Sequence, residues 1–132
     1  MEATFLQEAF EKRRGKQDEE SFLGVGEAFF KEVQRDATLV CPASVSADGD
    51  WGLLILNAAN GLKSIVVVSD VSYLDQFERN SNFGIQAKGI IQFLESREDI
   101  TGIVINPYDP SACYLPRESI FGMLKQCNIE YK

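Results

Sequence analysis

Apolar residues recur at helical spacing through the first quarter of the chain. Residues 2 to 14 carry apolar side chains three and four positions apart, which predicts a short amphipathic helix ending at Gly15. A second helix is expected from Ser21, as its cap, to about Asp36. Its wide apolar stripe contains Phe22, Val25, Gly26, Phe29, Phe30 and Val33.

The pattern then changes to short β-rich runs that are separated by turn residues. Thr38 to Val45, Trp51 to Ala59 and Ser64 to Val68 predict three meandering strands. Asp48-Gly49 and Asn60-Gly61 between them are strong hairpin signals, because both turn residues must tolerate a positive φ. The third run is continuously apolar, which predicts a strand with both faces covered by helices.

In the second half of the chain, strands alternate with helices. Ser69 or Asp70 caps the first of these helices, and Pro116 suits the first position of the last one. The expected elements are a helix over 71–79, a strand over 83–88, a helix over 89–99, strands over 101–106 and 112–115, and a helix over 116–126.

This order predicts an α/β (α+β) fold with a mixed β-sheet, an N-terminal β-meander and flanking helices. We expect a single domain over residues 1–132, made of a helical lead-in over 1–36 and an α/β core over 37–127. The lead-in must pack somewhere. Either it covers one face of the sheet or it mediates self-association.

Composition and charge narrow the class of partner. The chain has 132 residues, of which 45% are apolar, and a formal net charge of −7 with only one short basic cluster, residues 12–16. Nucleic acid is therefore an unsuitable partner. No run approaches the roughly 18 apolar residues of a membrane span, and no leader is seen, so we expect a cytoplasmic protein that does not bind membranes. Cys41, Cys113 and Cys127 suit free thiols in a reducing compartment.

The chain contains no histidine, which removes Ser-His and Cys-His catalysis and His-ligated metals. Three cysteines without a Cys-x-x-Cys pair do not form a zinc site, and Asp48-Gly49-Asp50 lacks the later ligands of a calcium loop. Cys41 has no identifiable base and is interpreted as a structural thiol. We expect no catalytic residues, no metal and no cofactor, and the sequence favours a protein that is not an enzyme.

A polar island interrupts the stretch Gly102 to Ile120, GIVINPYDPSACYLPRESI. Asn106 and Pro107 are typical of the end of a buried strand, and the residues that follow have turn composition. The alternative is a ligand site at the sheet edge, because open α/β sheets bind ligands where strands end. Its candidate residues are Asn106, Tyr108 and Asp109, with Arg117 as an anion holder and Trp51 as a stacking platform.

Three stretches in order resemble the N-terminal domain of the SseB family, named for enhanced sensitivity to serine. They are FFKEVQRDATLVCPASV, IVVVSDVSYLDQF, and GIVINPYD with YLPRESI, and the resemblance covers about residues 20 to 126. The middle strand departs from the family pattern at Val66 and Val68, and Cys41 interrupts a Val-Pro-like step. The resemblance implies a bacterial-type α/β module without an established reaction, which many members combine with a further C-terminal domain.

Two hypotheses remain for the function. The first is a non-enzymatic binding module that takes an unknown protein partner or self-associates through its Phe-rich N-terminal helices, where Asp at Phe5 or Phe10 should weaken a dimer. The second is a small-molecule-binding or enzymatic site at the loop from Asn106 to Ser111.

Overall fold

Helices and strands alternate along the chain, as the predicted α+β class requires. The computed structural model describes residues 1–45, 51–77 and 82–132, apart from the side chains of residues 44, 45, 51 and 76. The elements are α1 (Thr4–Arg13), α2 (Glu19–Gln34), β1 (Thr38–Val45), β2 (Trp51–Leu53), β3 (Ile55–Asn57), β4 (Lys63–Val67), the 3-10 helix η1 (Val71–Gln76), β5 (Asn82–Gln86), α3 (Ala87–Ser96), β6 (Gly102–Ile105), β7 (Cys113–Pro116) and α4 (Arg117–Gln126).

Most boundaries match the prediction to within two residues, and the differences have local causes. Helix α2 begins at Glu19 because Asp18, not Ser21, is its cap, and the Asp18 carboxylate accepts the Ser21 backbone N–H. The element after Asp70 is a 3-10 helix, which is short by nature, and residues 78 and 79 of its predicted span lie outside the described residues. The predicted Asp48-Gly49 turn also lies outside them.

The strand predicted over Trp51 to Ala59 is two strands, because the chain changes neighbours at Leu54. Before Leu54, β2 pairs with β1, and after it β3 pairs with β4. Leu54 itself bridges the two pairings, since its N–H donates to the Pro42 carbonyl and its carbonyl accepts the Val66 N–H. Alternating sidedness in a sequence cannot reveal such a change of neighbour.

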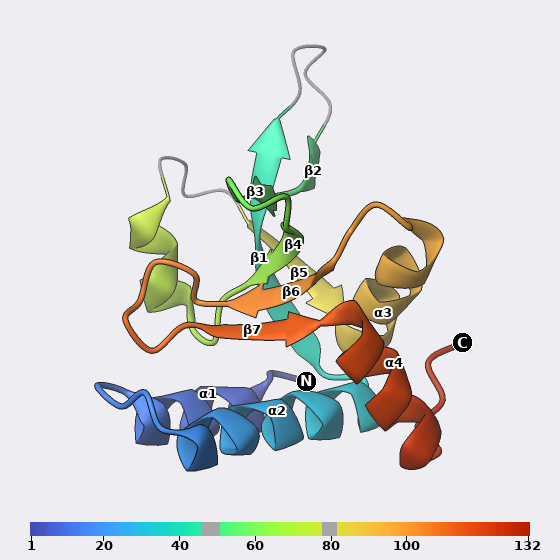
Figure 1. Cartoon of the computed structure of the whole chain (residues 1–132), viewed down its shortest axis with the longest axis horizontal. Coiled ribbons are helices and arrows are strands. Elements are labelled where there is room, and N and C mark those ends of the chain that lie inside the picture. Colours follow the sequence, from blue (N-terminus) through green and yellow to red (C-terminus); the bar gives the residue numbers. More distant parts are fainter. Residues whose placement is uncertain (46–50, 78–81) are drawn as a thin grey trace.

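Two sheets with the orders β2-β1-β5 and β3-β4-β6-β7 make up the β-structure, which is mixed as predicted. Strands β4 and β6 are parallel, and the other pairs are antiparallel. A bridge between Val40 and Val68 joins the sheets. Helices α1 and α2 run side by side beneath the strands, and α3 and α4 lie at the opposite end from η1 (Figure 1).

One apolar core connects the helical lead-in with both sheets. Strand β4 is buried from Ser64 to Val67, as its continuous apolar run predicted. The largest side chains that are wholly buried are Leu6, Phe10, Phe29, Leu39, Ile65, Ile90, Ile91, Leu94, Ile100, Ile103, Ile105 and Ile120. Because Leu6, Phe10 and Phe29 belong to this set, the lead-in covers the sheet and is an integral part of the domain.

A buried carboxylate holds the start of α1 in place. Ala3, which precedes α1, provides no side-chain cap, so the first N–H groups of the helix need acceptors from elsewhere. Glu32 of α2 is fully buried and accepts the Leu6 N–H at 3.3 Å. Its other oxygen lies 2.5 Å from Nε of Arg35, whose guanidinium also donates to the Glu2 carbonyl. Glu32 therefore connects the start of α1 with the end of α2.

Replacing Glu32 with alanine is expected to lower the free energy of unfolding by roughly 2–4 kcal/mol, because it leaves a buried helix N–H without an acceptor and removes the carboxylate that pairs with Nε of Arg35. Urea unfolding followed by circular dichroism measures the change. Glu11→Ala is the matched control, since Glu11 forms an exposed pair with Arg14 and its loss should cost about 0.5 kcal/mol or less. Equal losses in the two variants would contradict this role.

Candidate functional site

The predicted sheet-edge site begins at Asn106, which follows β6 and is fully buried. Its φ of 52° lies in the left-handed region, which Asn tolerates better than most residues. The side-chain oxygen accepts the Ser69 N–H at 3.0 Å, and Nδ2 donates to Ser69 Oγ at 2.8 Å. Both polar ends of the Asn106 amide are thus bound to the turn after β4, which leaves the side chain no group that faces a ligand.

Ser111, at the end of the same loop, is fully buried against the α1–α2 turn. Its hydroxyl donates to the Lys16 carbonyl at 2.8 Å. Its carbonyl accepts Nε of Arg13 at 2.8 Å, and the Arg13 guanidinium, which is also buried, donates further to the Asp18 carbonyl. The loop after β6 is therefore the attachment point of the helical lead-in.

The middle of the loop is more open. Tyr108 is 55% exposed, and its ring lies 5.2 Å from that of Phe77. The Asp109 carboxylate accepts the Ser111 N–H at 2.8 Å, which is the short turn that Asp before Pro favours. The Asp109 carboxylate is therefore used within the turn, and the exposed part of the Tyr108 ring is the remaining candidate for contact with a ligand in this loop.

Tyr73 of η1 is a polar group near this loop that the sequence did not single out. Its ring packs edge-on against Phe10 at 5.4 Å, and its buried hydroxyl has no hydrogen-bond partner in the part of the chain that is described. Burial raises the pKa of the Tyr73 phenol, and the Asp109 carboxylate acts in the same direction. Tyr73 therefore remains a neutral donor at physiological pH.

Of the other two predicted residues, Arg117 is not brought to this loop. Arg117 follows the end of β7 that pairs with Gly102, whereas Asn106 follows the opposite end of β6, roughly 16 Å away along the strands. The Arg117 guanidinium donates to the Leu94 carbonyl at 2.6 Å and the Arg97 carbonyl at 2.9 Å, which caps the end of α3. The side chain of Trp51 lies outside the described part.

Asn106→Ala is expected to lower the free energy of unfolding by about 2–4 kcal/mol, because it orphans the buried Ser69 donor and places alanine at a positive φ. Thermal or urea unfolding measures this. Tyr108→Ala, a change at an exposed residue two positions later in the same loop, should cost about 1 kcal/mol or less. If Asn106→Ala unfolded like the wild type, the structural role assigned to the amide would be wrong.

The three cysteines differ in access. Cys41 and Cys113 are buried, and burial raises the pKa of Cys41 to about 12 and that of Cys113 to about 11. Neither thiol can supply a thiolate near neutral pH, which agrees with their interpretation as structural residues. Cys127 is exposed after α4, with Sγ 3.5 Å from the Met123 sulfur. Among the residues that the structure describes, no three potential metal ligands gather.

An aromatic disulfide reagent at pH 8 is expected to titrate one thiol per native molecule, that of Cys127, because Cys41 and Cys113 are covered and protonated. In denaturant all three thiols should react. Absorbance of the released thiolate counts the groups, and Cys127→Ser should abolish the native signal. Rapid reaction of two or more native thiols would contradict the described burial.

An apolar hollow lies between α2 and α4. We call it the α2–α4 groove, and its volume is about 630 Å³. Leu23 is 55% exposed and Met123 39% exposed on its two walls. The full lining is Phe22, Leu23, Gly26, Glu27, Phe30, Lys31, Gln34, Pro116, Ser119, Met123, Cys127 and Ile129.

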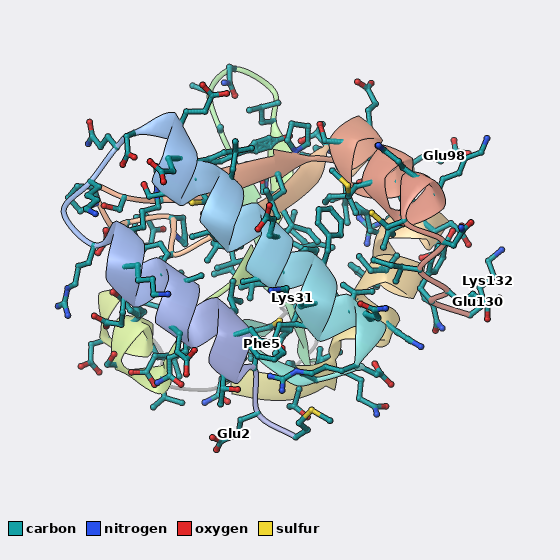
Figure 2. The ribbon with its side chains drawn as sticks, turned by 90° about the horizontal axis from the view of Figure 1, so that it is seen from below. Glu2, Phe5, Lys31, Glu98, Glu130 and Lys132 are labelled. Carbon is teal, nitrogen blue, oxygen red and sulfur yellow. The ribbon has the colours of Figure 1, made fainter. Side chains whose placement is uncertain are left out.

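A second hollow of about 440 Å³, between α1 and α2, is bordered mainly by charged side chains of both signs. Phe5 lies on the same face of the molecule as Lys31 (Figure 2), and the Arg35 guanidinium covers its ring at 4.1 Å from the centroid. Phe10 is in the core, so the expectation that it lies at a partner surface is wrong. Phe10 lies on the side of α1 that faces the sheet. The apolar stripe of a helix does not by itself reveal whether that side faces the core of the domain or a partner.

Leu23 and Met123 are the candidate binding residues that sequence reasoning missed. Leu23 stands at the margin of the apolar stripe of α2, where helical periodicity predicts partial exposure. Met123 comes from a helix 100 residues later, so its position beside Leu23 depends on tertiary packing. No local signal joins the two walls of the groove.

Comparisons of the chain with protein-family models, with curated proteins and with solved structures found no match. Within the ranges that the structure describes, the helices are too short or too polar to cross a membrane.

Proposed function

We propose that this protein is a non-enzymatic binding module that takes an apolar segment of a protein partner in the α2–α4 groove. The single observation that carries the proposal is the pair of exposed apolar walls, Leu23 on α2 and Met123 on α4, around a hollow of about 630 Å³. Contiguous apolar patches that are rimmed by polar residues are typical of protein-binding and ligand-binding surfaces. Methionine on such a surface adapts to differently shaped partners.

The position of the groove supports protein binding over small-molecule chemistry. Both walls are α-helices, and a hollow between two helices accepts the apolar face of a third helix. The loop after β6 offers less to a ligand, because Asn106 and Ser111 use their polar groups within the fold. The groove is therefore the better candidate of the two.

We also propose kinship with the N-terminal domain of the SseB family. Its support is the role of residues in the resembling stretch. A Cβ at Gly102 would clash with the Leu115 carbonyl oxygen, so the stretch needs glycine there, and Pro116 immediately precedes α4. Three free thiols support a reducing compartment such as the cytoplasm for this module.

Leu23→Asp is expected to weaken binding of the uncharged dye Nile red about tenfold, because an apolar contact worth roughly 1.5 kcal/mol is replaced by a carboxylate. Dye fluorescence at low protein concentration measures the binding. A synthetic amphipathic helix with leucines at positions i, i+4 and i+7 should displace the dye from the wild-type protein.

Val71→Asp provides the matched control, since Val71 is exposed on η1, outside the groove, and the charge change is the same. This variant should bind dye and peptide as the wild type does. A peptide that displaces no dye, or Leu23→Asp protein that binds as well as Val71→Asp protein, would overturn the assignment of the groove.

A further inference from the structure

We infer that the occupant of the α2–α4 groove is a second copy of this chain, packed with its α2 antiparallel to the first. This inference rests on the proposed function, because it names the partner for the same groove. It is carried by two features of α2: the order of charges along its exposed side and a glycine on the side that faces the groove.

The charges on the exposed side of α2 are self-complementary. Glu27 and Lys31 both line the groove and are exposed, one helical turn apart. Neither forms an ion pair with a residue in the described part of the chain. In an antiparallel pair of helices centred between them, Glu27 of each copy faces Lys31 of the other, so one contact is made twice. Such reciprocal pairing of opposite charges selects an identical helix as the partner.

Gly26 lets another helix approach closely. It lies inside α2, where glycine lowers helix stability relative to alanine. Among the residues that the structure describes, nothing requires glycine at this position, because a Cβ at Gly26 would meet no atom within 4 Å. The open space above it belongs to the groove, whose walls present Leu23 and Phe30. A helix packed over Gly26 would bury both side chains.

Charge reversal at the reciprocal pair tests the inference. Glu27→Lys and Lys31→Glu, each alone, bring like charges together twice and should weaken dimerisation about tenfold or more. A 1:1 mixture of the two variants restores both opposite-charge contacts, so a heterodimer should form with nearly wild-type affinity. Sedimentation velocity over about a hundredfold range of concentration measures the three equilibria.

The design separates local pairing from long-range repulsion. Glu27→Lys makes the formal net charge of −7 two units less negative, which by itself would favour association, yet we expect weaker dimerisation. The 1:1 mixture carries the same total charge as two wild-type copies. Both variants alter exposed residues of α2, and circular dichroism should show wild-type helix content.

The outcomes distinguish this inference from the proposed function. A wild-type protein that stays monomeric throughout, or a mixture that dimerises no better than the single variants, overturns the second copy as occupant. The groove still stands as a binding site if Nile red binding depends on Leu23 in that monomer. Dimerisation of the wild type, its loss in each variant and its return in the mixture would support the inference.

Discussion

The buried guanidinium of Arg13 is the contact on which the arrangement of this domain depends. A charged group without exposure to water must be surrounded by hydrogen-bond acceptors, and Arg13 finds them in the carbonyls of Ser111 and Asp18 and the hydroxyl of Ser21. These acceptors belong to the loop after β6 and to the start of α2. One side chain therefore joins the helical lead-in to the far end of the sheet, and the Ser111 hydroxyl returns the contact to the Lys16 carbonyl.

This attachment decides which surfaces remain for function. The loop after β6 holds the lead-in, and the polar groups of Asn106 and Ser111 form hydrogen bonds within the fold. The polar stretch after Ile105 therefore has a chiefly structural role. Because Glu32 and Arg13 hold the lead-in against the sheet, one side of α2 is committed to the core and the opposite side stays exposed. The α2–α4 groove lies on this exposed side of α2, where the packing of the lead-in against the sheet places α2 beside α4.

Local pattern predicted the elements well where one physical preference dominated. The continuous apolar run of β4 indicated a strand covered on both faces, and Asn60-Gly61 does form the turn before it, with Gly61 at a φ of 86°. The predictions were wrong where the outcome depends on which distant segment a residue packs against. The switch of neighbours at Leu54 and the burial of Phe10 depend on residues far along the chain. Arg117 is a similar case. Its position in the first turn of the last helix suggested that it would hold an anion, whereas its guanidinium donates to carbonyls at the end of α3.

By itself, the sequence determined the α+β class, the order of most elements and the absence of histidine chemistry, because periodicity, turn residues and composition act locally or over the whole chain. Tertiary structure alone decided what each polar residue of the island contacts, which phenylalanines face the core, and that Leu23 and Met123 share a groove. These are properties of packing between segments up to 100 residues apart. No local preference encodes them, since each follows from where the helices settle on the sheet.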